Sequence, residues 1–142
     1  MTVLDAACLV ALFRGEPGAD AVGELIRAGA VLSAINRAET IDRLVRQGAG
    51  ATDVRADLDV LELESPPVTI ELADRAGMLR ATHYHRTTSA LSLADCVALA
   101  TAIDLDRPLA TSDHALARVA WALGLDVCAI ANSHGDAPTQ GD

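Results

Sequence analysis

Residues 92–103 read Ser92-Leu93-Ala94-Asp95-Cys96-Val97-Ala98-Leu99-Ala100-Thr101-Ala102-Ile103, a stretch long enough for a helix and apolar on nearly every side. A helix that is apolar all round is buried. Asp95 is its only charged residue, and residues 3–13 form a second apolar run with one charge, at Asp5. An isolated buried carboxylate is costly unless it is paired, protonated or bound to a cation. Neither run contains a basic residue, so a cation from outside the chain is the simplest remedy.

On both sides of this segment, short apolar runs alternate with stretches of helical periodicity, which is typical of an α/β domain with a mostly parallel sheet. A chain of 142 residues accommodates one such domain. The predicted strands are 3–4, 30–32, 61–63, 109–110 and 127–130. The predicted helices are 6–13, 20–28, 34–47, 52–60, 70–85, 93–103 and 113–124. We expect the domain to end near residue 131, and residues 132–142, which are rich in Gly, Pro and polar side chains, to form a flexible tail.

Four acidic residues fall where this arrangement brings them together. Asp5 follows the first predicted strand and Asp113 follows the fourth. Asp95 lies in the first turn of the helix that leads to the fourth strand, and Glu39 lies in the second turn of the helix after the second strand. In open parallel sheets, ligands bind outside the carboxyl ends of the strands, where the strand order reverses. Three or four carboxylates at such a point suit Mg²⁺ or Mn²⁺.

Each of these acids also has an explanation that needs no metal. Asp113 fits a helix N-cap, and Asp95 can complete a capping arrangement with Ser92. Glu39 can be a solvated helix residue. Asp5 is harder to explain in this way, because a strand end inside an apolar run offers it little water. All four acids are less easily explained together than any one of them alone, and this favours a metal site.

A fifth acid, Asp42, lies three residues after Glu39 and therefore shares its helix face. Two interpretations are open. Asp42 can be an acid just outside the metal ligands, which orients them, or it can be the plain ion-pair partner of a nearby arginine such as Arg46.

The charge balance limits the kinds of partner. The formal net charge is −9, and all eleven basic residues are arginine. Such a chain does not attract nucleic acid strongly at long range, which counts against a DNA-coating role but leaves open a nuclease that holds its substrate through a few arginines and a metal ion. Aromatic residues, at 2%, leave no platform for stacking bases. No apolar run approaches the ~20 residues of a membrane span, and no basic signal-peptide start precedes Asp5, so we predict a cytoplasmic protein.

Four short motifs each carry one of the four acids. They are Val3-Leu4-Asp5-Ala6, Ser33-Ala34-Ile35-Asn36-Arg37-Ala38-Glu39, Leu91-Ser92-Leu93-Ala94-Asp95 and Leu109-Ala110-Thr111-Ser112-Asp113. In this order and spacing they resemble the PIN-domain ribonucleases, and in particular the VapC-type toxins of bacterial toxin–antitoxin pairs. The resemblance covers residues 3 to about 131. Any one motif is weak, whereas the four together are fairly specific.

The resemblance implies a three-layer α/β/α domain, with a parallel sheet of about five strands and helices on both faces. The catalytic, metal-binding quartet that it implies is Asp5, Glu39, Asp95 and Asp113. Thr111 or Ser112 is then a nearby hydroxyl that contacts metal-bound water or substrate. The resemblance also implies a homodimer and a tight complex with a small VapB-like antitoxin, through which alone the protein reaches DNA.

The functional hypothesis is a metal-dependent endoribonuclease that hydrolyses RNA phosphodiester bonds with Mg²⁺ or Mn²⁺. Arg14, Arg37 and Arg86 are the arginines that we predict to contact the RNA backbone. The alternatives are a PIN-type nuclease that acts in RNA processing or on DNA, and a non-catalytic PIN-like binding module. A phosphoacceptor signalling domain also gathers acids at strand ends, but it senses the phosphoryl group with a lysine, and this chain has none.

Overall fold

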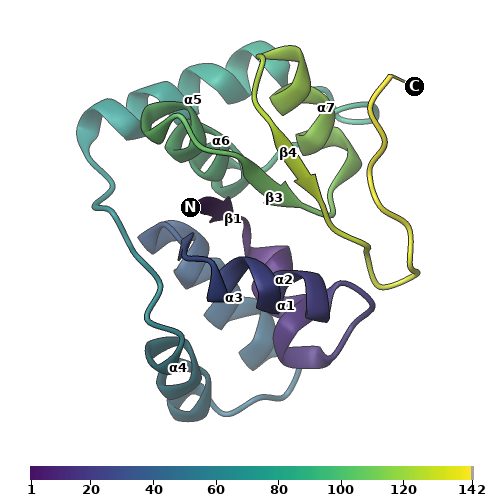
Figure 1. The fold of residues 1–142 in the computed structure, drawn as a ribbon. Helices are drawn as coiled ribbons and strands as arrows, with labels where there is room; N and C mark the ends of the chain where they lie inside the picture. Colours follow the sequence, from purple (N-terminus) through teal and green to yellow (C-terminus); the bar gives the residue numbers. More distant parts are fainter. Residues whose placement is uncertain (142) are drawn as a thin grey trace.

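The computed structural model describes residues 1–141, in which four parallel strands form one sheet in the order β2-β1-β3-β4 (Figure 1). The strands are β1 (Thr2–Leu4), β2 (Ala30–Val31), β3 (Leu109–Thr111) and β4 (Val127–Ala129). The helices are α1 (Ala6–Arg14), α2 (Ala19–Arg27), α3 (Ala34–Arg46), α4 (Ala51–Val60), α5 (Ile70–His83), α6 (Leu93–Leu105) and α7 (His114–Ala122). The predicted mostly parallel α/β domain is confirmed.

Helices cover both faces of the sheet. Successive residues of a strand point to opposite faces, so each apolar strand presents side chains that must be buried on both sides. Val3 and Leu109 belong to a core cluster with side chains of α5, α6 and α7. Leu4 and Ala110 belong to a second cluster with side chains of α1, α2, α3 and α4. Figure 1 shows these two groups of helices on opposite sides of the strands. The expected three-layer α/β/α arrangement is therefore present.

The third predicted strand, residues 61–63, is reduced to a single parallel bridge between Val31 and Glu64. Two backbone hydrogen bonds form it, from Leu32 N to Glu64 O at 2.8 Å and from Glu64 N to Ala30 O at 3.2 Å. Glu62, at φ 52°, has a left-handed conformation that a strand does not tolerate. Two prolines, at 66 and 67, follow the bridge and lack the N–H that would extend the ladder. Four strands and this bridge agree with the expected sheet of about five strands.

The strand order reverses between β1 and β3. From β1 the chain passes through α1 and α2 to β2 on one side, whereas β3 pairs with β1 on the other side through the register Leu4↔Ala110. Asp5 N extends this pairing toward Ala110 O at 3.4 Å. The carboxyl ends of β1 and β3 thus lie side by side, which is where a ligand crevice is expected in a sheet of this kind.

The segment after β4 begins with a turn around Asn132, whose Oδ1 accepts hydrogen bonds from the backbone N–H groups of His134 at 2.9 Å and Asp136 at 3.0 Å. Further along, Pro138 is buried and lines a small cavity with His114 and Arg118 of α7. The flexibility expected of residues 132–142 stays a prediction, and the last residue of that range lies outside the described residues. Within residues 1–141, no helix has the length and apolarity that crossing a membrane requires.

Candidate metal-binding site

Asp5 occupies the carboxyl end of β1 and is also the N-cap of α1. Its Oδ1 accepts the N–H of Cys8 at 3.0 Å, and its Oδ2 accepts the hydroxyl of Thr111 at 2.5 Å. Only 3% of the residue is exposed. Burial is the largest influence on this carboxyl and raises its pKa from 3.8 to about 6, against the lowering effect of the Thr111 hydrogen bond. The negative charge of Asp95 raises the pKa of Asp5 further.

Asp95 stands in the first turn of α6, where it forms a capping box with Ser92. Ser92 N donates to Asp95 Oδ2 at 2.9 Å, and Asp95 N donates to Ser92 Oγ at 3.0 Å. The capping role considered from the sequence is therefore real, but it does not neutralise the carboxylate. Burial raises the pKa of Asp95, and the nearby Asp113 adds to that rise. Capping and membership of an acidic cluster occur together here.

Glu39 joins the cluster from the second turn of α3. Burial raises the pKa of this half-buried side chain, and the charges of Asp95 and Asp5 raise it further. Asp113 joins from the far side as the N-cap of α7, where its Oδ1 accepts the N–H of Leu116 at 2.9 Å. The four predicted acids therefore come from four separate elements to one edge of the sheet.

Thr111 connects two of these acids, at the end of β3. Its fully buried hydroxyl donates to Asp5 Oδ2 and accepts the N–H of Asp113 at 3.0 Å. Its contacts in the structure are with the carboxylate of Asp5 and the backbone of Asp113, and the contact with metal-bound water or substrate that the resemblance implies stays a prediction. The neighbouring Ser112 lines a groove described below.

Asn36, which belongs to the second of the four motifs, lies between the starts of two helices. Its Nδ2 donates to Ala94 O at 3.0 Å, and its Oδ1 accepts the hydroxyl of Ser33 at 2.6 Å. Ala94 directly precedes Asp95, so this fully buried amide ties the start of α3 to the start of α6. The sequence feature that could have indicated this contact is a polar residue on the inner face of a predicted helix, because buried polar side chains are generally hydrogen-bonded.

Arg43 is a second residue that the sequence analysis did not single out. It lies one helical turn after Glu39, and its positive charge lowers the pKa of both Glu39 and Asp95. It also lines a polar groove of about 440 Å³. The lining residues are Ala7, Val10, Arg14, Glu16, Arg43, Gln47, Ser112, Asn132 and Ser133. The i, i+4 spacing from Glu39 was the sequence feature that pointed to Arg43.

Asp42, Arg37 and Arg86 are three further predicted site residues, and none of them contacts the four acids through a hydrogen bond or ion pair among the described residues. Asp42 is exposed on α3 and pairs with Arg46 through three contacts of 2.9–3.1 Å. Arg37 pairs with Asp59 of α4 at 2.9 Å. Arg86 is exposed on the loop between α5 and α6. The roles assigned to these three residues stay predictions.

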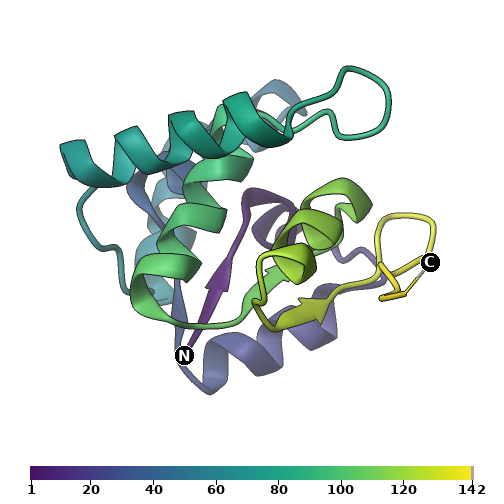
Figure 2. The ribbon, with the colours of Figure 1, turned by 90° about the horizontal axis from the view of Figure 1, so that it is seen from above.

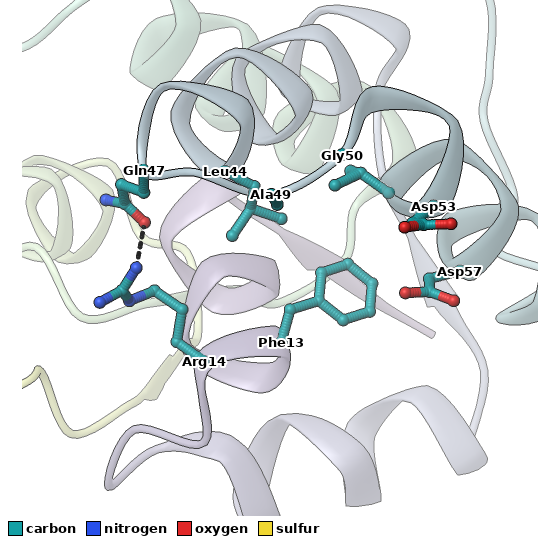
Figure 3. A pocket seen from close by; sticks show the side chains of 9 residues that line it. Phe13, Arg14, Leu44, Gln47, Ala49, Gly50, Asp53 and Asp57 are labelled. Carbon is teal, nitrogen blue, oxygen red and sulfur yellow. Dashed lines mark hydrogen bonds between the residues drawn. The ribbon is translucent and has the colours of Figure 1, made fainter.

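Arg14 stands between the polar groove and a second pocket. Its guanidinium donates to Gln47 Oε1 at 2.8 Å and lies 3.6 Å from Glu16 Oε2. The second pocket, of about 280 Å³, lies between α1 and the α3–α4 turn, and Figure 3 shows the ring of Phe13 and the carboxylates of Asp53 and Asp57 lining it. None of the four clustered acids lines either hollow. The polar groove is connected to the cluster through Ser112, the chain neighbour of Asp113, and through Arg43, whose charge acts on Glu39 and Asp95.

The cluster fits a divalent cation in chemistry. Its donors are carboxylate oxygens, which Mg²⁺ and Mn²⁺ prefer. Within residues 1–141, none of the four acids takes part in an ion pair. Over the same residues, no three His, Cys, Asp or Glu side chains stand in a metal-holding arrangement. One oxygen of each of the three aspartates accepts a backbone N–H at the start of a helix, and these bonds hold the carboxylates in their orientations.

Comparison with known proteins agrees with this description. The family model of the PIN domain matches residues 2–122, so the chain belongs to the PIN domain family, as its motifs indicated. Comparison with curated protein sequences found no match.

Several solved structures are similar in fold. The Mycobacterium tuberculosis toxin VapC20, described as cleaving the sarcin–ricin loop, has a TM-score of 0.70 at 17% identity, over 88% of this chain and 96% of that one. FitAcB of Neisseria gonorrhoeae has a TM-score of 0.65 at 21% identity, over 89% and 96%. VapBC2 of Rickettsia felis, bound to a DNA fragment from its promoter, has a TM-score of 0.65 at 18% identity, again over 89% and 96%. At these identities the likenesses establish the fold.

Proposed function

We propose that the chain is a metal-dependent endoribonuclease and the toxin of a type II toxin–antitoxin pair. The observation that carries the proposal is the group of four acids at the edge between β1 and β3, of which Asp5 is buried and the others are partly buried, and none of which takes part in an ion pair among residues 1–141. Burial, and to a smaller extent the repulsion between the acids, raises the pKa values of Asp5, Glu39 and Asp95. Such a group is stabilised by a cation, and PIN-domain membership makes nuclease chemistry the natural use of that cation.

Asp5 and Asp95 would hold the cation, with Glu39 and Asp113 completing its surroundings directly or through water. Bound there, Mg²⁺ or Mn²⁺ supplies a Lewis acid for the phosphate and lowers the pKa of a coordinated water. Thr111 keeps Asp5 in place, because its hydroxyl donates to Oδ2 while its backbone is held in β3. The capping bonds of Asp95 and Asp113 orient those carboxylates in the same way.

The substrate proposed is RNA, entering along the polar groove beside the cluster. Arg14 and Arg43 line this groove and offer charge-assisted hydrogen bonds to phosphate. Ser112, on the same lining, offers a hydroxyl next to Asp113. Arg37 and Arg86 stay as outer candidates for contact with the RNA backbone.

The partners proposed are a second copy of the chain and a small VapB-like antitoxin, with DNA reached only through the antitoxin. Relatives in fold have been solved as toxin–antitoxin complexes, one of them from Klebsiella pneumoniae and others bound to DNA, and this supports the proposal. We propose a cytoplasmic location for the same reason.

The test is cleavage of total RNA and of single-stranded DNA by the purified protein in Mg²⁺, Mn²⁺ or EDTA. The Asp95→Asn variant keeps an oxygen for the Ser92 N–H, so its helix cap is expected to survive. Asp74→Asn, on the exposed side of α5, is the matched control. RNA cleavage that needs metal, is lost in Asp95→Asn and persists in Asp74→Asn is the expected result. RNA cleavage that is unchanged in Asp95→Asn would exclude the site, and no cleavage or metal binding under any condition would exclude the nuclease.

A further inference from the structure

Basic residues gather in one part of this acidic protein. Residues 75–94 contain no Asp or Glu, although the chain has 20 acidic residues, and they carry three arginines and two histidines. They form the second half of α5 and the loop of residues 84–91, here called the basic loop. Figure 2 shows the basic loop extending outward beyond the end of α5. Local positive charge is therefore available here despite the net charge of −9.

The basic loop is held in shape by its own hydrogen bonds. His85 and Ser89 exchange two backbone hydrogen bonds of 2.9 Å and 3.0 Å, and His85 Nδ1 accepts the N–H groups of Thr87 at 3.2 Å and Thr88 at 3.3 Å. The guanidinium of Arg118, on α7, donates to Thr88 O at 2.7 Å. The loop thus presents its side chains from a defined backbone, so binding there loses little conformational entropy.

Tyr84, at the start of the basic loop, is the only tyrosine of the chain and is 44% exposed. The guanidinium carbon of Arg80 lies 4.3 Å from the centre of its ring, and Arg80 Nε donates to Leu91 O at 2.8 Å. Arg80 is thereby fixed over the ring, which holds the ring in one orientation. An exposed aromatic ring that is held in this way is a suitable surface for a flat ligand.

Arg86 supplies an available charge two residues after Tyr84. It is exposed, and within the described residues it has no ion pair, unlike Arg37, Arg46 and Arg75, which pair with carboxylates. The basic loop continues directly into Ser92, whose backbone N–H is bonded to Asp95. The ring and the free guanidinium therefore lie on the segment that leads into the acid cluster.

We infer that the basic loop binds single-stranded RNA beside the cleavage site, with an unpaired base stacked on Tyr84 and a backbone phosphate on Arg86. The inference rests on the proposed function and adds a binding site to it. Stacking on an aromatic ring together with a cation that contacts the backbone is the usual way in which proteins hold single strands without reading their sequence. An acidic protein segment would use Arg86 but would gain nothing from the ring. The inference departs at this one residue from the expectation, based on the aromatic content, that the chain has no platform for stacking bases.

The test measures binding of the full chain to a fluorescein-labelled single-stranded RNA of about ten nucleotides, by anisotropy in EDTA so that cleavage does not interfere. Tyr84→Ala is expected to weaken binding roughly tenfold, whereas Tyr84→Phe, which keeps the ring, should bind as the parent does. Arg86→Ala is expected to weaken binding several-fold and to reduce the salt slope by about 0.7, the value for one lost phosphate contact with a single strand. Arg55→Ala, which removes an exposed arginine of α4 without an ion pair among the described residues, should have no effect.

Two further probes make the result specific. The parent and Tyr84→Ala should bind an abasic strand of the same length with equal affinity, because no base is left to stack. A labelled oligoglutamate of equal charge should bind more weakly than the RNA. If oligoglutamate binds equally well through Arg86, or if Tyr84→Ala binds the RNA as the parent does, the inference is overturned. In that case, RNA cleavage that is abolished by Asp95→Asn would still support the nuclease proposal. If the parent neither binds nor cleaves RNA, both the inference and the nuclease proposal are excluded.

Discussion

Glu39 and Asp42 are three residues apart on the same helix, α3, yet their environments move their pKa values in opposite directions. Glu39 is half-buried among other acids, and burial and the charge of Asp95 raise its pKa. Asp42 is exposed, and its hydrogen bonds to Arg46 lower its pKa. The first carboxylate therefore forms no ion pair, although the charge of Arg43 acts on it, whereas the second is paired with Arg46. The comparison teaches that position in the tertiary structure, and not residue type, separates a candidate ligand from an ordinary surface ion pair.

The largest effect that tests this comparison is on cleavage. Asp5→Asn removes a negative charge from the unpaired cluster, so RNA cleavage in Mg²⁺ should fall by about a hundredfold or more, the scale on which lost metal contacts act. Initial rates on a labelled RNA measure the effect, and circular dichroism confirms the fold. A variant that keeps the parent's rate would mean that Asp5 is only a helix cap.

The next effect is on stability against pH. The pKa of Asp5 is raised from 3.8 to about 6, so the folded state holds this proton more tightly than the unfolded state does. The stability contributed by that proton is complete below pH 3.8 and is lost as the pH rises through about 6, a change of about 3 kcal/mol. In EDTA, the parent should lose this stability between pH 4 and pH 7, whereas Asp5→Asn should not. The free energy of unfolding of Asp5→Asn should therefore increase relative to that of the parent over this range. Urea unfolding at several pH values measures this, and a constant difference would contradict it.

A smaller effect is expected at Thr111. Thr111→Val keeps the shape but removes the donor to Asp5 and the acceptor for Asp113 N. Leaving buried polar groups unsatisfied costs about 1–3 kcal/mol, so the free energy of unfolding should fall by that amount. In the parent, the hydrogen bond from Thr111 lowers the pKa of Asp5, so the pKa should rise further when this bond is removed. Thr111→Ser, which restores the hydroxyl, should recover most of the loss.

The smallest effect is expected at the exposed member of the comparison. Asp42→Asn breaks the pair with Arg46, which lies in water where ion pairs contribute little. The melting temperature and the rate of RNA cleavage should both match the parent. A clear loss of cleavage with normal stability would instead assign Asp42 to the site, as the first sequence interpretation allowed.

Much of the local structure was predictable from short-range patterns. Ser33, Thr69 and Ser92 directly precede the predicted helices 34–47, 70–85 and 93–103, and each caps its helix with its hydroxyl. The third predicted strand was shortened to one bridge, because the conformation of Glu62 depends on how the chain turns between α4 and the sheet edge. Local propensity describes helices and caps well because their bonds join residues three or four positions apart.

The candidate site was predictable in its residues but not in its contacts. Isolated acids in apolar runs identified Asp5 and Asp95, since burial of an unpaired charge is costly wherever it occurs. The part played by Arg43 and the tie between Asn36 and Ala94 were missed, because each depends on how α3 is placed against α6.

The sequence by itself determined the α/β class, the bounds of most elements and the four acids with their spacing. Only the tertiary structure decided that β3 lies beside β1, so that Thr111 bonds to an acid 106 positions away. It also decided that α7 holds the basic loop, through the hydrogen bond from Arg118 to Thr88 O. The physical reason is that periodicity and capping are set by neighbours along the chain, whereas strand order and helix docking are set by which apolar faces are buried together, and a single sequence does not state that pairing.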